Sequence, residues 1–420
     1  MIQHMTYDDA VATLEGALKF GMNPSLEPIR AMCAAMGEPQ KRYRCIQVAG
    51  TNGKSSTTRM IAALMRAQGL HVGLYVSPHL VKYPERIEID GCVVSDEAFA
   101  RGIEAALDAA ARAHVEATEF ELLTAAALWL FAQEGADWVV LECGLGGRWD
   151  ATSVVNPQVA VITGVALEHT AILGGTIEKI AAEKAAIIKL GSRAIFAHDL
   201  AAREVFERQA QQVCAPYENA NPEAVIPFED ELASLPTYQR SNLATALAAV
   251  TAALGHAPSP ESVRMALSEL VIPGRFEILR HDPLVIIDAA HNPQSAHALA
   301  GELQRLFDGV GQGDRSFVPL DSSGTNDLSP CPTLLLGVLD DKDARGIIRE
   351  LCPLFSRIVV TASSSPRSVP AAKLAMLVEE ECGVRPEIAT SISEARELLR
   401  HEPVIATGSI TVAGEVKDIW

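Results

Sequence analysis

The sequence predicts an α/β protein of two domains, each built on a mostly parallel β-sheet. Short apolar runs rich in Val and Ile alternate with helical stretches, which is the pattern of parallel strands joined by crossover helices. The same alternation starts again in the last third of the chain. A chain of 420 residues is also too long for one ordinary core, because domains usually hold about 100 to 200 residues.

The first strand of the N-terminal domain is predicted at residues 46–49, directly before a turn that contains glycine. The next segment, 54–68, is predicted to be a helix, because its apolar residues recur on one face and Gly69 follows it. Three further strands are predicted at 72–76, 138–143 and 159–163. Three further helices are predicted at 96–114, 122–133 and 177–189. This alternation predicts one sheet with helices on both faces.

The second series of strands starts after residues 271–276, whose Pro-Gly pair is a turn signal. We therefore predict an N-terminal domain of residues 1–273 and a C-terminal domain of residues 274–420. Strands of the C-terminal domain are predicted at 284–288, 333–338, 357–361 and 403–407. This smaller domain is predicted to be a Rossmann-like α/β unit. Residues 309–332, rich in Gly, Ser, Asp and Pro, are predicted to form a surface loop within it.

Composition and charge exclude several classes of protein. The formal net charge of −18 argues against a nucleic-acid partner, because so acidic a chain repels phosphate backbones. None of the eight cysteines forms a C-x-x-C pair, which leaves zinc ribbons and redox motifs without support. No basic and apolar leader opens the chain, and no run reaches the roughly 18 apolar residues of a membrane span. We expect a cytoplasmic monomer with no membrane partner.

Residues 48–56 read Val-Ala-Gly-Thr-Asn-Gly-Lys-Ser-Ser, between a predicted strand and a predicted helix. In this context of a phosphate-binding loop, Gly50 and Gly53 let the backbone approach phosphate and helix amides point at the anion. Lys54 can reach the β and γ phosphates of ATP, and the Ser55 hydroxyl can bind Mg²⁺. We therefore predict that the N-terminal domain is of the P-loop type. The predicted ATP-binding residues here are Gly50, Thr51, Asn52, Gly53, Lys54, Ser55 and Ser56. The alternative is a plain glycine-rich turn, since the first glycine of the usual spacing is absent.

Further motifs follow along the chain, among them Ser-Pro-His-Leu, Pro-Gly-Arg-Phe and Asp-Ala-Ala-His-Asn-Pro. The matching segments are 77–80, 85–87, 141–152, 166–170, 183–187, 273–276 and 288–293. With these motifs in order, the chain resembles the Mur ligase superfamily, and within it the folylpolyglutamate synthases and dihydrofolate synthases of the bacterial bifunctional type. The resemblance implies ligation of L-glutamate to folates and to dihydropteroate through an acyl phosphate, with ATP and Mg²⁺.

The resemblance assigns the Mg²⁺ ligands to Ser55, Ser77, Glu142 and His169. Read without it, Glu142 ends an apolar strand beside a glycine-rich loop, where either a ligand site or a buried structural glutamate is expected. A lone histidine is an unusual ligand for a hard cation, so His169 alone is interpreted as structural. Lys184 matches a lysine that the family carries as a carbamate, a CO₂ adduct that turns a cation into an anion. The alternative interpretation of Lys184 is an ordinary lysine on the solvated face of a helix.

The catalytic candidates are Lys54, Lys184 and His291, and the role of His291 stays open. The resemblance places Asn242 near the adenine of ATP and assigns further ATP contacts to Arg275 and Asp288. These positions also fit a helix start, a surface charge and a strand-end cap, while the last two, at the domain boundary, fit an ATP cleft between domains. The substrate candidates are Thr118, Glu119, Phe120 and Glu121 near the pterin, and Ser409 near glutamate. The Phe120 ring could stack on a flat heterocycle or pack in the core.

Two other functions remain open from the sequence. One is a cell-wall Mur ligase that adds an amino acid to a UDP-sugar peptide, against which the motifs at 77–80 and 273–276 argue. The other is a nucleotide-binding module that ligates nothing, which the candidates of the second domain disfavour. Phosphate release that requires both glutamate and a folate would separate a folate ligase from both.

Overall fold

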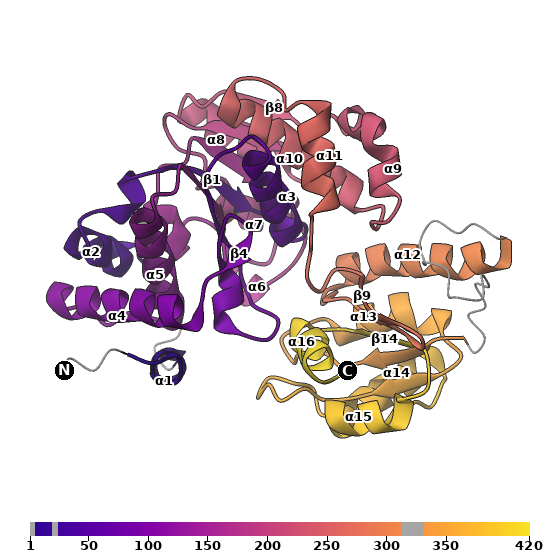
Figure 1. Ribbon diagram of the computed structural model, residues 1–420. Coiled ribbons are helices and arrows are strands. Elements are labelled where there is room, and N and C mark those ends of the chain that lie inside the picture. Colours follow the sequence, from indigo (N-terminus) through magenta and orange to yellow (C-terminus); the bar gives the residue numbers. More distant parts are fainter. Residues whose placement is uncertain (1–4, 19–23, 313–330) are drawn as a thin grey trace. The chain divides into compact units, whose positions relative to one another are not determined.

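The computed structural model describes residues 5–18, 24–312 and 331–420. The chain divides into two compact units (Figure 1). Unit 1 comprises Met1–Phe228 and Gln239–Val271, and unit 2 comprises Glu229–Tyr238 and Ile272–Trp420. The chain passes from unit 1 to unit 2 for the last time after Val271, whereas the sequence predicted the domain boundary after residue 273. The hydrophobic pattern of the sequence did not predict that residues 229–238 belong to unit 2.

Within the described residues, unit 1 contains an eight-stranded sheet of order β4-β3-β2-β5-β1-β6-β7-β8. The strands are β1 (Arg44–Ala49), β2 (Val72–Tyr75), β3 (Ile87–Ile89), β4 (Cys92–Val93), β5 (Trp138–Glu142), β6 (Val159–Ile162), β7 (Arg193–Phe196) and β8 (Tyr217–Asn219). All pairs from β2 to β8 in this order are parallel, and β3 and β4 extend the edge beside β2 as antiparallel strands. The predicted mostly parallel sheet is confirmed.

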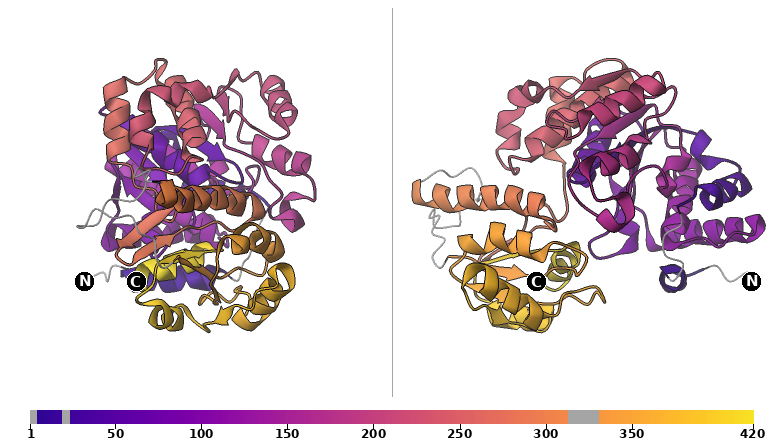
Figure 2. Two further views of the ribbon diagram at one scale, coloured as in Figure 1. Left: turned by 90° about the vertical axis from the view of Figure 1, so that its right-hand side faces the viewer. Right: turned by 180° about the vertical axis from the view of Figure 1, so that it is seen from behind.

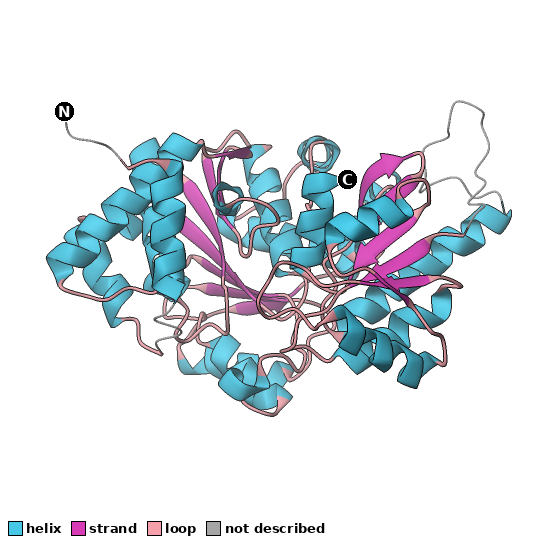
Figure 3. Cartoon of the chain, turned by 90° about the horizontal axis from the view of Figure 1, so that it is seen from below, coloured by secondary structure: helices cyan, strands magenta, loops and turns pink. Residues whose placement is uncertain are grey.

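Helices cover both faces of this sheet (Figures 1 and 3). They are α1 (Tyr7–Ala17), α2 (Glu27–Ala35), α3 (Lys54–Arg66), α4 (Asp96–Ala113), α5 (Glu119–Glu134), α6 (Thr170–Leu173), α7 (Ile177–Ala185), α8 (Arg203–Gln212), α10 (Gln239–Leu254) and α11 (Pro260–Ser268). Short 3₁₀ turns are η2 (Pro39–Lys41), η3 (Tyr83–Arg86), η4 (Ala151–Val154) and η5 (Pro222–Phe228). Side chains of a strand alternate between the two faces of its sheet. In β1, Cys45 and Ala49 belong to the cores on the face covered by α4, α5 and α7. Ile46 and Val48 point to the other face, which α3 and α10 cover.

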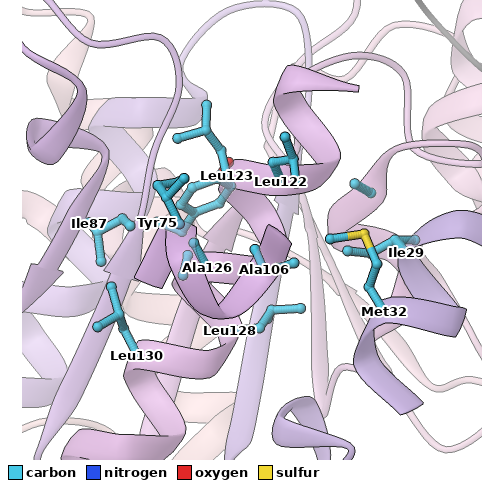
Figure 4. Packing of buried hydrophobic residues seen from close by; sticks show 14 of the residues in the cluster. Ile29, Met32, Tyr75, Ile87, Ala106, Leu122, Leu123, Ala126, Leu128 and Leu130 are labelled. Carbon is cyan, nitrogen blue, oxygen red and sulfur yellow. The ribbon is translucent and has the colours of Figure 1, made fainter. Parts of the chain in front are cut away.

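A large core of unit 1 lies between α1, α2, α4, α5 and the sheet. Figure 4 shows part of it, with Ile29, Met32, Tyr75, Ile87, Ala106, Leu122, Leu123, Ala126, Leu128 and Leu130 labelled. Helix α5 is buried on nearly all sides, which explains why its sequence has little polar–apolar periodicity. This burial holds the start of α5, and the predicted substrate segment there, against the sheet.

Unit 2 contains a six-stranded sheet of order β13-β12-β11-β14-β10-β9 in the part of the chain that is described. Its strands are β9 (Glu277–His281), β10 (Leu284–Ile287), β11 (Thr333–Leu336), β12 (Ile358–Val360), β13 (Glu387–Ile388) and β14 (Val404–Thr407). Its helices are α9 (Glu229–Leu232), α12 (Pro293–Gln312), α13 (Ala344–Leu351), α14 (Ala371–Cys382), α15 (Ile392–Leu399) and α16 (Ile410–Ile419), with the 3₁₀ turn η6 (Cys352–Leu354). The strands lie between helices (Figure 2), and β9 alone of these six is antiparallel to its neighbour. The predicted Rossmann-like architecture is confirmed.

The first residues of the predicted surface loop at 309–332 belong instead to α12, which continues to Gln312. Residues 313–330 lie outside the described part of the chain. Among the helices that are described, none is long and apolar enough to cross a membrane.

Candidate active site

The candidate residues of unit 1 gather at the carboxyl-terminal edge of its sheet. β1 leads into the phosphate loop, residues 50–53, and β5 ends on Glu142. Ser77 follows β2, and Thr163 follows β6. β5 and β6 lie on either side of β1 although they come later in the chain, so these loops converge. Open α/β sheets bind ligands at such an edge, beside a strand with neighbours on both sides that arrive by separate crossovers.

Glycines allow the phosphate loop to approach its neighbours closely. Gly53 has φ +82°, in the left-handed region that favours glycine, and it immediately precedes α3. A Cβ at Gly50 would overlap the Thr163 hydroxyl oxygen and would come within 3.2 Å of the Gly164 backbone nitrogen. The backbone of the loop therefore leads directly into the N-terminus of α3. There the free backbone amides and the helix dipole favour binding of an anion.

Hydrogen bonds hold this loop against the segment after β6. The Thr51 backbone N–H donates to the Gly164 carbonyl at 2.8 Å, and the Thr163 hydroxyl donates to the Asn52 carbonyl at 2.7 Å. The Lys54 ammonium curls back to donate to the Thr51 carbonyl at 3.0 Å. Its charge therefore lies directly over the loop, and the phosphate-binding role of Lys54 stays a prediction.

Replacing Gly50 by alanine should lower the free energy of unfolding by about 1–3 kcal/mol, because the added methyl group overlaps the Thr163 side chain. Thermal unfolding followed by circular dichroism measures this loss. The matched control is Gly175→Ala, since a Cβ there would meet nothing within 4 Å. Equal stability of the two variants would contradict the close approach at Gly50.

Three of the four predicted metal ligands come together at this edge. The Ser55 hydroxyl donates to Glu142 Oε1 at 2.9 Å, and the Ser77 backbone N–H donates to Glu142 Oε2 at 3.3 Å. Glu142 is only 1% exposed, so its carboxylate is a buried anion beside the Lys54 loop. Carboxylate and hydroxyl oxygens form a donor set that suits a hard divalent cation such as Mg²⁺. The residues present therefore fit the implied metal.

His169, the fourth predicted ligand, has a different setting. It directly precedes α6 with φ +48°, and its Nε2 lies 3.5 Å from Glu168 Oε1. Within the described ranges, no group of three or more His, Cys, Asp or Glu side chains is arranged to hold a metal ion.

Lys184 is buried, which excludes the alternative of a solvated helix lysine. It is 4% exposed, and its Nζ donates to the Gly50 carbonyl at 2.6 Å. Burial, reinforced by the charge of Lys54, lowers the pKa of Lys184 to about 7, while the nearby Glu168 opposes that shift. A large fraction of this amine is therefore neutral near neutral pH. A lysine on α7 thus reaches the phosphate loop across 134 positions of sequence.

Asp150 organises the glycine-rich loop after β5, a role that the sequence reading missed. Its carboxylate accepts bonds from the Leu145 N–H at 2.8 Å and the Thr152 N–H at 3.0 Å, and burial raises its pKa. A Cβ at Gly147 in this loop would come within 2.8 Å of the Glu183 carbonyl, so the loop lies directly on α7. The sequence did contain a signal for this role, an aspartate two residues before a threonine. At this spacing an aspartate side chain commonly accepts a backbone hydrogen bond and forms a turn.

The predicted substrate segment Thr118–Glu121 begins α5 earlier than expected, because Thr118 and Glu121 form a capping box. The Thr118 N–H donates to Glu121 Oε2 at 2.8 Å, and the Glu121 N–H donates to Thr118 Oγ1 at 3.2 Å. Phe120 is half-buried, its ring centroid is 6.1 Å from that of Tyr75, and a Cβ at Gly144 would lie 2.6 Å from it. The ring therefore covers the start of the glycine-rich loop.

Glu119 belongs to a buried polar network that also contains the Ser-Pro-His motif. Its carboxylate lies 3.6 Å from Arg86 Nη2, and the Arg86 Nε–H donates to His79 Nδ1 at 3.0 Å. Burial, followed by the charge of Arg86, lowers the pKa of His79 to about 3. The turn that carries Ser77 is thereby tied to the start of α5. The sequence reading recognised this motif but not the network.

Ser56 and Asn242, two predicted ATP contacts, lie on the first turns of α3 and α10. These two helices lie side by side (Figure 1). Gln239, which the sequence reading missed, is completely buried on the first turn of α10. Asn242 therefore lies inside the helix start that the sequence predicts.

The candidates of unit 2 follow β10 and β14, which are neighbours. Asp288 is 4% exposed; its Oδ2 accepts bonds from the Phe276 N–H at 2.8 Å and the Tyr238 hydroxyl at 3.3 Å. Its Oδ1 accepts the Ala290 N–H at 2.8 Å, and burial raises its pKa. These contacts are those of a strand-end cap. Phe276, with φ +52°, is held in the left-handed region by this carboxylate.

The remaining candidates of unit 2 are held by backbone contacts. His291 Nδ1 lies 2.8 Å from the Ala289 carbonyl, so this nitrogen carries the proton. Ser409 caps α16 by accepting the Val412 N–H at 3.1 Å, and Arg275 Nη1 donates to a carbonyl one residue away. The structure thus brings His291 and Ser409 to the same edge of one sheet as Asp288.

Comparison with known proteins identifies the family. The model of the Mur ligase middle domain matches residues 48–224. A dihydrofolate synthase/folylpolyglutamate synthase of Mycobacterium tuberculosis is 33% identical, over 95% of this chain and 90% of that protein. Among solved structures, the M. tuberculosis folylpolyglutamate synthase complexed with ADP superposes with a TM-score of 0.85 at 30% identity, covering 98% of each chain. The bifunctional enzyme of Yersinia pestis complexed with AMPPNP and a Mn ion has a TM-score of 0.81 at 26% identity, covering 100% and 99%.

Identity at this level over nearly the whole of both chains, together with the shared fold and the phosphate loop, leads to one conclusion. The chain belongs to the dihydrofolate synthase/folylpolyglutamate synthase family of Mur-type ligases.

Proposed function

We propose that the protein joins L-glutamate to the carboxylate of tetrahydrofolates with ATP, and that it also adds glutamate to dihydropteroate. The observation that carries this proposal is the buried Glu142, which meets Ser55 of the phosphate loop and the Ser77 turn at one edge. A phosphoryl group delivered there would be surrounded by a cation, loop amides and a metal-binding carboxylate. Membership of the ligase family supports the same reading.

The chemistry explains why such an edge is needed. A carboxylate is a poor electrophile, so the γ-phosphoryl group of ATP first converts it to an acyl phosphate, which the glutamate amine then attacks. Phosphoryl transfer depends on positioning and on charge stabilisation. Lys54 and the amides of the phosphate loop would hold the triphosphate. His291, on unit 2, is proposed as a catalytic residue whose individual step stays open.

Ser55, Ser77 and Glu142, with His169, would hold Mg²⁺. When bound, the ion would neutralise charge on the phosphoryl oxygens during transfer. The oxygen donors of the first three residues favour a hard cation, and a related structure contains Mn. His169 is proposed as a ligand from the family match alone.

Lys184 is proposed to carry a carbamate. CO₂ adds to a neutral amine with release of a proton, and the lowered pKa of Lys184 leaves a large neutral fraction near neutral pH. The resulting anion would lie between the phosphate loop and Glu168, near the Lys54 charge. It would help to orient a metal ligand or its water.

The other assignments are proposals from the family match. Asn242, Arg275 and Asp288 would contribute to the ATP site. Ser409 would contact glutamate, and Thr118, Glu119, Phe120 and Glu121 would lie near the pterin. The half-buried Phe120 ring supports this role, because aromatic faces stack on flat heterocycles. We further propose that the protein acts as a monomer in the cytoplasm.

Purified protein with ATP, Mg²⁺ and L-glutamate should release phosphate with either dihydropteroate or tetrahydrofolate. Both reactions activate a carboxylate and use the same amine, so one catalytic centre can serve both. The test is to run the two substrates side by side, measuring phosphate and identifying the glutamylated product by mass spectrometry.

Omission of glutamate or of the folate should abolish phosphate release. Product from tetrahydrofolate alone would make the protein a monofunctional polyglutamylating enzyme. Phosphate release that depends on neither folate would reject the ligase proposal.

A further inference from the structure

The turn before β9, residues 274–276, carries Arg275, which is proposed above to contribute to the ATP site. We call these three residues the arginine turn. Two of its backbone positions lie in the left-handed region, because Gly274 has φ +65° and Phe276 has φ +52°. Glycine adopts this conformation freely, but phenylalanine stays there only where its surroundings hold it. Strained backbone that is held in this way often serves to aim a functional side chain, and the charged side chain here is Arg275.

Hydrogen bonds to two carboxylates hold the arginine turn at both of its ends. The Phe276 N–H donates to Asp288 Oδ2 at 2.8 Å. The Gly274 N–H donates to Glu277 Oε2 at 2.7 Å, and the Gly274 carbonyl accepts the Ala289 N–H at 2.9 Å. One carboxylate follows β10 and the other begins β9, so the conformation of the turn depends on both strands.

Glu277 has a second partner on a different element. The Lys417 ammonium, in the last turn of α16, donates to Glu277 Oε1 at 2.6 Å. The side chains of Lys417 and Glu277 are 32% and 20% exposed, so water screens this pair less than an ion pair on the open surface. Each oxygen of Glu277 therefore has its own partner. The carboxylate cannot turn away from Gly274 without breaking the ion pair with Lys417.

The Arg275 side chain lies near the carboxyl end of β10. Its Nη1 donates to the Gly274 carbonyl at 2.9 Å. Burial raises the pKa of Asp288, and the charge of Arg275 opposes that rise, so the guanidinium group is close to this carboxylate. Open α/β sheets bind ligands at this edge. A change in the direction of the arginine turn would move the guanidinium group relative to that edge.

We propose that Glu277 and Lys417 are positioning residues, which hold the arginine turn so that the guanidinium group of Arg275 meets ATP. A guanidinium group binds phosphate oxygens through two N–H groups in a fixed geometry, so its direction matters. Glu277 and Lys417 act on the nucleotide only through Arg275. This inference rests on the proposed ATP-dependent function and adds two residues that the sequence reading did not single out.

Affinity for ATP, measured by calorimetry with Mg²⁺ present, tests this inference without turnover. Lys417→Met keeps most of the side-chain length and removes the charge, and Glu277→Ala removes the carboxylate. Each change should weaken ATP binding about tenfold, as expected for a lost hydrogen bond between charged groups. Lys417→Arg keeps the charge and should keep most of the affinity.

The effect of Lys417 should disappear once Arg275 is absent. Arg275→Ala should itself weaken ATP binding, and adding Lys417→Met to this variant should weaken it no further, because both changes remove the same contact. Arg400→Met is the matched control, since it breaks an exposed ion pair with Glu397 elsewhere in unit 2. It should leave the affinity unchanged. Unfolding temperatures of all variants separate binding from folding.

Three results would overturn the inference. One is an equal loss of ATP affinity on Lys417→Met with and without Arg275, which would show that the effect does not pass through the guanidinium group. Another is a lower unfolding temperature with unchanged affinity, which would make the ion pair purely structural. The third is an unchanged affinity in Arg275→Ala itself. Wild-type protein that binds ATP but releases no phosphate with folate and glutamate would reject the ligase proposal and leave this inference standing.

Discussion

Lys54→Ala should slow glutamate-dependent phosphate release by ~10³-fold while the protein stays folded, a loss comparable with that of other preorganised charge stabilisers. The Lys54 ammonium lies over the phosphate loop, 3.0 Å from the Thr51 carbonyl, and α3 begins at this residue. Lys54 is only half-buried, and its ammonium group contacts the loop, so the main loss on changing it to alanine is a charge. Initial rates at saturating ATP, with unfolding temperature as the check on folding, measure the effect.

Lys373→Ala removes an equal charge from an exposed position on α14 and serves as the matched control. It should leave the rate unchanged. If the Lys54→Ala variant turns over near the wild-type rate, phosphate is not held by this loop, and the assignment of the ATP site at β1 is wrong.

Lys184→Met should reduce activity by about 10- to 100-fold, as expected for a group that orients metal ligands. Methionine fills the volume of this buried side chain, so packing is largely kept, but it cannot form a carbamate. The rate of phosphate release measures the loss, and the smaller Lys184→Ala variant should regain part of its activity with added formate or acetate. These acids would occupy the space of the missing carbamate.

The carbamate itself has a pH signature. The pKa of Lys184 is lowered to about 7, so its neutral, reactive form increases as the pH rises through that value. CO₂-depleted protein should therefore regain activity with bicarbonate faster at about pH 8 than at about pH 6. Carbon-13 bicarbonate should also give a carbamate signal in wild type that Lys184→Met lacks. An unmodified Nζ in electron density with bicarbonate present at neutral pH would argue against the carbamate.

The sequence located the elements that local patterns decide. All four strands predicted in each domain are present with ends shifted by at most two residues, since runs of buried Val, Ile and Leu define them. The strands it missed are short or lie toward the sheet edges, for example β4 (Cys92–Val93) and β13 (Glu387–Ile388), whose residues are exposed and lack apolar alternation. Helix starts moved where a cap decided them, as at Thr118.

Much of the candidate site was also visible locally. Glu142 and Ser77 stand directly after apolar runs, and parallel strands bring their carboxyl ends to one edge. Their meeting with Ser55 follows from that rule once β5 is placed between β2 and β1. Only the family resemblance, not the pattern, singled out Lys184, whose neighbours in sequence resemble an ordinary surface helix.

By itself, then, the sequence determined the two mostly parallel sheets, the glycine-containing loop after β1 and the strand ends that carry the candidate ligands, because periodicity, glycine and capping act between near neighbours. The tertiary structure alone decided the burial of Lys184 on Gly50, the packing of Phe120 over Gly144 and the link from Gln239 to Ser56. These contacts join residues far apart in the chain. The solvation and hydrogen-bond partners of such side chains depend on which helices pack together, and no local pattern records that.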